Sequence, residues 1–205
     1  MTTDQPRNRL DGPRGEIVEA ARQIALSAGL SAITLRRLAS TAGVAPGVVA
    51  EHEPSISALV ARTFEELADE ELAETILNVR SLNDPLDTLR MLVDTLIDDS
   101  HEGFNSVWAD AWSIGRRNPP LARKTRESMD GWNALILEVI ARGIAAGQFA
   151  DVDPDLVAMQ FIALIDATTA YSLVDYRRPP ERAYLVRRTL EISLGLADGA
   201  LSTEA

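Results

Sequence analysis

The chain of 205 residues contains no cysteine, only one lysine, Lys124, and no long apolar run. Without cysteine it has neither a disulfide framework nor a thiolate metal site. Its longest uncharged apolar stretch, residues 156–165, is too short to cross a bilayer. Residues 1–16 are polar and lack the apolar segment of a secretory signal, so we expect a cytoplasmic protein with no membrane partner.

Basic residues are scarce overall but unevenly spread. The net charge is −11, which argues against a protein that coats nucleic acid. Residues 1–50 carry six arginines against four acidic residues, a net +2, whereas the remainder carries 14 basic and 27 acidic residues, a net −13. A basic head on an acidic body is typical of a DNA-binding protein. An acidic soluble protein with an arginine-rich tail is the alternative.

Apolar residues recur at helical spacing along most of the chain, and no strand pattern of useful length appears. Proline, glycine and asparagine separate the helical stretches. The sequence therefore predicts an all-α fold of about nine helices. They are expected at about residues 14–27, from 34, 45–51, 55–80, 85–100, 104–117, 121–146, 154–176 and 181–196.

Residues 34–53 carry the pattern of a helix-turn-helix. Leu35 and Ala39 fall on one face of a first helix, and Gly43 follows as a residue that takes a left-handed turn at low cost. In the short helix that comes next, Val49 is expected to face inward. Two helices joined so tightly leave the second one projecting, free to enter a major groove.

A set of small, turn and apolar residues between positions 14 and 60 matches a known pattern. Its members are Ile17, Ala20, Ala21, Gly29, Thr34, Leu38, Ala39, Ala42, Gly43, Val44, Gly47, Pro54, Ser55 and Leu59. With them the chain resembles the tetracycline-repressor (TetR) family of transcriptional regulators. The resemblance implies a disordered tail at 1–13, a helix-turn-helix DNA-binding domain at 14–60, an effector-binding and dimerisation domain at 61–198, and a tail at 199–205.

The second helix of the helix-turn-helix, expected at 45–51, and the residues just after it depart from the family pattern. The family usually has aromatic residues where this chain has Ala50 and Glu53, and a lysine where it has Ile56. The first aromatic and the lysine normally touch DNA phosphates, and here Glu51 and Glu53 add negative charge instead. Since phosphate contacts supply most of the sequence-independent affinity, we expect weaker DNA binding unless other residues compensate.

The candidate DNA-binding residues lie on the second and third expected helices. The resemblance implies a phosphate contact for Thr34, while Arg36 and Arg37 are either compensating phosphate anchors or a solvated face. The third helix offers no basic side chain for guanine and no amide for adenine, so we expect modest base readout. The full set is Thr34, Arg36, Arg37, Ala45, Pro46, Gly47, Val48, Glu51 and His52.

Large apolar residues of the body are candidates for an effector pocket, a plain core being the alternative. Because the resemblance implies an effector-binding body, we expect a small, largely apolar effector. Asp166, in an apolar run, is either a pocket group for a polar or cationic ligand or a satisfied helix–helix contact. The candidate set is Met91, Phe104, Trp108, Trp112, Met129, Trp132, Ile136, Met159, Phe161 and Asp166.

The last two expected helices carry more apolar residues than one thin body can bury. The resemblance implies that they pair with their copies across a two-fold axis, so that a homodimer presents two heads to two half-sites. Monomeric packing is the alternative. The candidate interface residues are Leu156, Ile162, Leu173, Leu185, Leu190 and Leu194.

No catalytic constellation, phosphate loop or metal-ligand cluster is present, so we expect neither an enzyme nor a cofactor. The adjacent residues 51–53, Glu-His-Glu, cannot converge on one ion within a helix. The sequence thus predicts a ligand-responsive transcriptional repressor that binds a double-stranded DNA operator and a small-molecule effector as a homodimer. The alternative is a dimeric ligand- or protein-binding module of the same fold with weakened or lost DNA binding.

Overall fold

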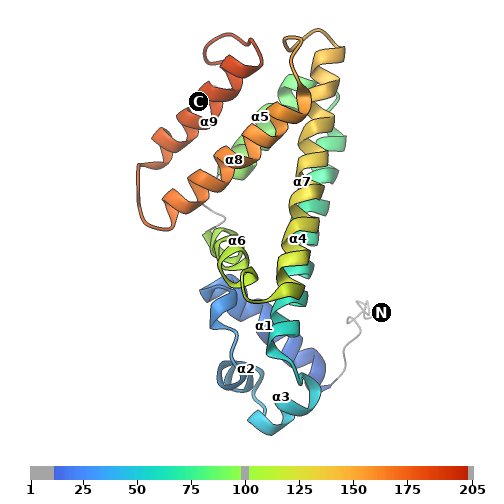
Figure 1. Ribbon diagram of the computed structural model, residues 1–205, viewed down its shortest axis with the longest axis vertical. Coiled ribbons are helices and arrows are strands. Elements are labelled where there is room, and N and C mark those ends of the chain that lie inside the picture. The colour runs from blue at the N-terminus through green and yellow to red at the C-terminus, as the bar shows by residue number, and fades with distance from the viewer. Residues whose placement is uncertain (1–11, 98–101, 203–205) are drawn as a thin grey trace, which may run out of the picture.

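The structure, a computed structural model, describes residues 12–97 and 102–202. Over these residues it contains nine α helices, one short 3-10 helix and no strand, which confirms the predicted all-α fold. Figure 1 shows an elongated molecule with α1 to α3 at one end and α9 toward the other. The elements in order are α1 (Pro13–Ala28), η1 (Leu30–Ala32), α2 (Leu35–Ala42), α3 (Pro46–His52), α4 (Ile56–Ser81), α5 (Pro85–Ile97), α6 (Glu102–Gly115), α7 (Pro119–Ala145), α8 (Pro154–Ser172) and α9 (Pro179–Ser193).

Capping and turn residues define the helix-turn-helix of the head. The hydroxyl of Thr34 caps α2 by accepting a hydrogen bond from the Arg37 amide at 3.3 Å. Gly43 ends the helix in the left-handed region, with φ 68°. Pro46 occupies the first turn of α3, where its missing amide leaves no bond unmade, and Val49 is fully buried. The sequence therefore specifies the head locally.

The long helix α4 joins the head to the body. The Ser55 hydroxyl caps it by accepting from the Ala58 amide at 3.2 Å. Its first half buries Phe64 and Leu67 in the core of the head, and its second half buries Val79 in the core of the body. α7 runs alongside it (Figure 1). A displacement of α4 would therefore move residues of both the head core and the body core.

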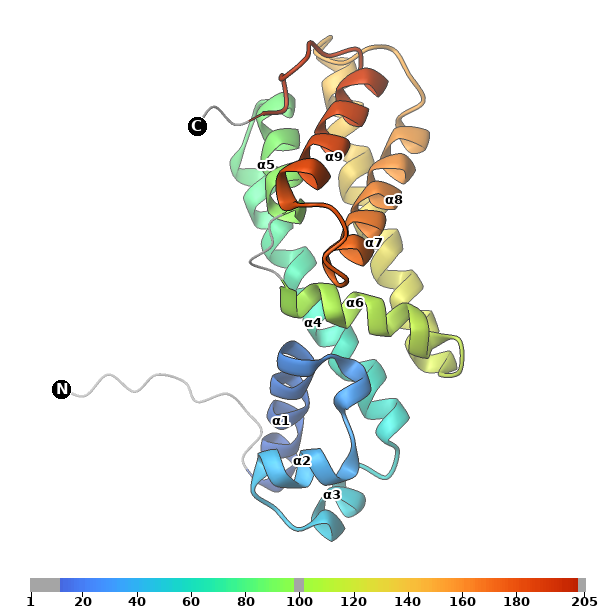
Figure 2. The ribbon, with the colours of Figure 1, turned by 90° about the vertical axis from the view of Figure 1, so that its left-hand side faces the viewer.

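Helix α6 lies across the molecule between the head and the rest of the body (Figure 2). Val107 and Ala111 of this helix are buried in the core of the head. Trp108 packs against both the head core and the body core. None of the helices described has both the length and the apolar character needed to cross a bilayer.

Three details differ from the sequence expectations. η1 was not predicted, because a single 3-10 turn leaves no periodic signal. Helix α8 ends at Ser172 rather than near residue 176, since Asp175 and Arg177 adopt positive φ angles of 53° and 63°. Leu35 is 37% exposed rather than inward-facing, because Leu38 and its neighbours already fill the inner face of the short α2.

The expected C-terminal tail at 199–205 is packed as far as the structure describes it. Leu201 is fully buried, and its amide donates a 3.0 Å hydrogen bond to the buried carboxylate of Glu191. Leu201 thus anchors the start of this stretch to the end of α9. Of the expected disordered tail at 1–13, residues 1–11 lie outside the described residues, and Pro13 already belongs to α1.

Candidate functional site

The candidate DNA-binding residues gather at the free end of the head (Figure 1). Seven of the nine are exposed, and Val48 and His52 are half-buried at the edge of α3. Arg36 and Arg37 project from α2, and neither forms an ion pair with another residue that the structure describes. Unpaired guanidinium groups at this position suit phosphate contacts, which position a protein on DNA without reading its sequence.

The surface of α3 offers little chemistry for reading bases. Pro46 and Gly47 are exposed at its start, and Glu51 is the exposed charged group at its end. A carboxylate accepts hydrogen bonds and can pair with cytosine, while α3 presents no arginine or amide for guanine or adenine. Recognition through this face would depend on phosphate contacts and DNA shape.

Glu53, expected close to the DNA phosphates, points into the head instead. Its side chain is 4% exposed, and Arg62 of α4 donates to its Oε2 at 2.5 Å. Arg14 of α1 lies 3.8 Å from Oε1. The carboxylate therefore ties the end of α3 to α1 and α4, and of the two glutamates only Glu51 adds negative charge to the exposed surface.

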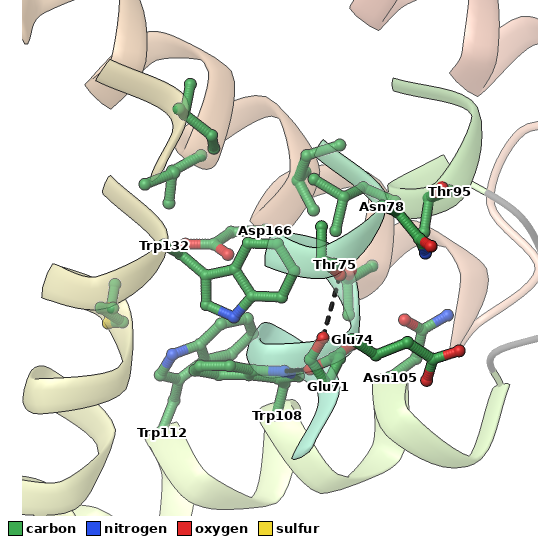
Figure 3. Close-up of a pocket in the computed structure, with 16 residues that line it drawn as sticks. Glu71, Glu74, Thr75, Asn78, Thr95, Asn105, Trp108, Trp112, Trp132 and Asp166 are labelled. Carbon is green, nitrogen blue, oxygen red and sulfur yellow. Dashed lines mark hydrogen bonds between the residues drawn. The ribbon is translucent and has the colours of Figure 1, made fainter. Parts of the chain in front are cut away.

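A cavity of ≈ 140 Å³ lies in the body between α4, α5, α6, α7 and α8. Figure 3 shows Trp108 and Trp112 of α6 and Trp132 of α7 around it. The ring centroids of Trp108 and Trp112 are 6.0 Å apart. The lining residues are Glu71, Glu74, Thr75, Asn78, Thr95, Leu96, Asn105, Trp108, Trp112, Met129, Trp132, Ile136, Ile162, Ile165, Asp166 and Thr169.

Six of the ten candidate pocket residues line this cavity, including all three tryptophans and Asp166. The other four do not. Phe161 is fully buried in the body core, Phe104 packs against the head core, and Met159 is 57% exposed on the outside of α8. Met91 is half-buried against the body core, where the Thr95 hydroxyl lies 3.6 Å from its sulfur. Helical spacing alone does not distinguish cavity, core and surface positions.

Most of the polar lining was not predicted from the sequence. Glu71, Glu74, Thr75 and Asn78 line the cavity from α4, although the acidic stretch 65–74, which includes both glutamates, is typical of a solvated helix face. Their spacing of i, i+3, i+4 and i+7 is the signal that could have revealed them, because it places all four on one helix face. The indole Nε1 of Trp108 donates to the Glu71 carboxylate at 3.1 Å.

The cavity is electrostatically negative. It contains three carboxylates, those of Glu71, Glu74 and Asp166, and its lining includes no lysine, arginine or histidine among the described residues. Burial raises the pKa of Asp166 to about 6, because the apolar surroundings disfavour its charged form. The described residues hold no group of three or more side chains suited to a metal ion. A cation is the ligand that would stabilise the charged form of Asp166.

The outer surfaces of α8 and α9 expose large apolar side chains. Among the six candidate interface residues, Leu156, Leu173 and Leu185 are 63%, 41% and 41% exposed. Of the other three, Leu190 and Leu194 are fully buried in the body core, and Ile162 is half-buried and lines the cavity. Additional exposed apolar residues on or beside these helices are Met159, Val174, Tyr176, Tyr184 and Ile192.

A family model described as BetI-type transcriptional repressor, C-terminal, matches residues 85–194, more than half of the chain. This chain belongs to the TetR family of transcriptional regulators. The HTH-type transcriptional regulator BetI of Stenotrophomonas maltophilia is 28% identical over 181 residues, which cover 80% of this chain and 92% of that protein. By the family-model match, the chain is a BetI-type transcriptional regulator.

Solved structures of other regulators share the TetR fold. A transcriptional regulator from Saccharomonospora viridis in complex with choline has a TM-score of 0.79 and 22% identity, covering 87% of this chain and 95% of that one. A TetR regulator from Haloarcula marismortui has a TM-score of 0.74 and 22% identity, covering 89% and 96%. At this identity the likeness establishes the fold alone.

Proposed function

We propose that this TetR-family chain is a homodimeric transcriptional repressor whose effector is a small organic cation. Residues 14–60 would bind operator DNA, and residues 61–198 would bind the effector and form the dimer. Effector binding would reposition the two heads and release the DNA, which is a coupling between two sites. Such a protein acts where the chromosome is, in agreement with the expected cytoplasmic location.

The observation that carries the proposal is the pairing of tryptophans with carboxylates around one cavity. Tryptophan faces attract cations, and aromatic cages are the usual means of recognising quaternary ammonium groups. The carboxylates supply the counter-charge, with no competing cation in the described lining. The choline complex of the similar Saccharomonospora viridis regulator supports the same class of ligand. The effector would thus be cationic rather than only apolar.

A matched pair of ligands tests the class of effector. Choline and its neutral carbon isostere, 3,3-dimethyl-1-butanol, have nearly the same shape and differ in charge. We expect choline to change the tryptophan fluorescence of the protein in a saturable manner, because the three tryptophans surround the cavity, and the isostere to bind at least about tenfold more weakly. Equal binding of the two compounds, or binding of neither, would contradict a cation-binding cavity.

Operator binding is tested with the promoter DNA next to the gene that encodes this chain. We expect retention of this DNA at moderate salt, and release on adding choline. A two-fold symmetric dimer predicts a pseudo-palindromic operator, with half-sites one helical turn or a multiple of it apart. A footprinting experiment in which the protein protects a site without such symmetry would count against two identical heads.

A dimeric ligand-binding module with weakened DNA binding is the second candidate. The observation that favours it is α3, which exposes Glu51 and Ala50 and carries no arginine or lysine. This candidate predicts equal and feeble binding to every duplex, strongly reduced by salt, together with normal choline binding. Specific retention of the promoter fragment against unrelated duplex DNA would exclude it.

A further inference from the structure

Two faces of helix α6 make different contacts. Asn105, Trp108 and Trp112, at i, i+3 and i+7, line the cavity. Asp110 faces the head instead, where its Oδ2 accepts a 2.7 Å hydrogen bond from the backbone amide of Ser31. Ser31 belongs to η1, the turn that connects α1 to α2. One helix therefore lines the cavity and also contacts the segment that leads into the helix-turn-helix (Figure 2).

Helix α6 packs closely against the head at two glycines. A Cβ atom added to Gly103 would lie 2.7 Å from the carbonyl oxygen of Leu26, near the end of α1. A Cβ atom added to Gly29 would lie 2.5 Å from Oδ2 of Asp110. Backbone and carboxylate thus approach the head as closely as glycine permits. At contacts this close, a movement of α6 displaces the head, because packed cores resist compression.

We propose that Asp110 is a positioning residue for regulation. When an effector occupies the cavity, Asp110 transmits the resulting movement of α6 to the head through its hydrogen bond with the Ser31 amide. This inference rests on the proposed function, since it requires an effector in the cavity and DNA on the head.

The starting point of the relay is Trp108. Its indole Nε1 donates to Glu71, one of the cavity carboxylates, at 3.1 Å, and its ring meets Phe64 of the head core edge-on, with centroids 5.1 Å apart and planes at 88°. A cation that binds between Trp108 and Glu71 competes for that carboxylate and shifts α6. Asp110, half a turn along the same helix, moves with it and pulls on η1, and so on the start of α2 at Thr34.

The test compares the unchanged chain with Asp110→Ala and with a control, Asp151→Ala, which removes an exposed carboxylate far along the chain, in the loop before α8. Two ratios are measured: the Kd for promoter DNA with saturating choline over that without it, and the Kd for choline with saturating DNA over that without it. Both ratios must agree for a true linkage.

We expect a ratio of about 5–150 for the unchanged chain and for Asp151→Ala, within the usual range of allosteric coupling. Asp110→Ala should bind choline alone within about twofold of the unchanged chain, whereas its ratio should fall toward 1. A second variant, Asp110→Asn, keeps an acceptor oxygen for the Ser31 amide and removes the charge. It should give an intermediate ratio, and it guards against an alanine variant that does not fold.

The outcomes separate the two proposals. If the unchanged chain binds neither choline nor DNA, the proposed function fails and the relay fails with it. If the unchanged chain shows coupling and both Asp110 variants retain the same ratio, the relay alone is overturned. A reduced ratio with unchanged choline affinity is a result that a merely structural role of Asp110 would not produce.

Discussion

Arg62 donates a 2.5 Å hydrogen bond to the carboxylate of Glu53, which is 4% exposed at the end of the recognition helix α3. A buried carboxylate is tolerated only when it is paired, and the second partner, Arg14, is farther away at 3.8 Å. The pair therefore holds α3 against α4. It stands where the TetR family usually has an aromatic residue, so an ionic contact replaces an apolar one at this position.

Removing Arg62 should destabilise the protein more than removing an unpaired arginine. In Arg62→Ala the Glu53 carboxylate keeps only the distant Arg14, and we expect a loss of about 1–3 kcal/mol in the free energy of unfolding. The matched control is Arg126→Ala, because Arg126 is exposed and has no ion pair among the described residues. This variant should change the free energy of unfolding by less than about 0.5 kcal/mol. Urea denaturation measures both. Equal stability of the two variants would show that the pair does not support the head.

The head illustrates what a sequence can and cannot predict. Local signals sufficed for much of the helix-turn-helix: the left-handed Gly43 and the buried Val49 lie as predicted. The direction of the Glu53 side chain could not be predicted, because its partner Arg62 lies on another helix. A glutamate two residues after an exposed glutamate looks like surface charge until the three-dimensional partner is known.

The arginines of α2 should supply phosphate contacts that α3 lacks. We expect Arg36→Ala/Arg37→Ala to weaken binding to promoter DNA and to unrelated duplexes alike. The slope of log K against log salt should fall in magnitude by about 3.6 for the dimer, or about 0.9 for each of the four phosphates that an arginine no longer neutralises. Arg80→Ala is the control and should leave the slope unchanged, because Arg80 lies in the last turn of α4, at the end of that helix away from the head. A filter-binding series across salt concentrations gives the slopes. An unchanged slope in the double variant would place the phosphate contacts elsewhere.

The exposed faces of α8 and α9 should hold the dimer together. Leu156 is 63% exposed and Ile192 is 65% exposed, and a glutamate at either position would bury a charge in a paired interface. We expect Leu156→Glu and Ile192→Glu to raise the dimer dissociation constant by at least about tenfold, equivalent to about 1.4 kcal/mol. Leu77→Glu is the matched control, because Leu77 of α4 is 68% exposed away from these helices. Analytical ultracentrifugation distinguishes the cases, and a monomeric unchanged chain would refute the dimer.

The cavity shows the complementary limit of sequence reasoning. The three tryptophans were recognisable as candidates, because large aromatics close together in sequence attract attention. Glu71 and Glu74 were not, since a charged residue on a long helix is usually solvated; Glu74 is itself exposed, as are Asp69 and Glu70 just before Glu71. Which charges face a cavity depends on how α4 packs against α6 and α7, and that packing is not encoded in local periodicity.

Trp112 should contribute directly to the affinity for cations. It lines the cavity next to Trp108, at a centroid distance of 6.0 Å. Trp112→Leu keeps an apolar lining but removes the aromatic face, and we expect the Kd for choline to rise about 5–30-fold, or about 1–2 kcal/mol. The affinity for the neutral isostere should change much less, which provides an internal control. Isothermal titration calorimetry measures both, and an equal loss for the two ligands would mean that Trp112 only fills space.

Choline binding should weaken in acid through Asp166. Burial raises the pKa of this carboxyl to about 6, and a bound cation favours the ionised form, so protons compete with the effector. If only the carboxylate binds, affinity should be nearly constant above about pH 7 and about tenfold lower at pH 5. Asp166→Asn should bind weakly with a flatter profile, which separates the contribution of Asp166 from those of Glu71 and Glu74.

The same pKa sets the pH dependence of stability of the ligand-free protein. Because the folded-state pKa of Asp166 is raised above its ordinary value, folding favours the protonated form, and stability should be lost as the pH rises through about 6. Asp166→Asn should lack this part of the loss, so that at pH 7.5 the variant melts higher than the unchanged chain while binding choline more weakly. Thermal melts at pH 5 and pH 7.5 measure the difference. A variant that is less stable at both values would instead assign Asp166 to a satisfied helix–helix contact, the alternative that the sequence left open.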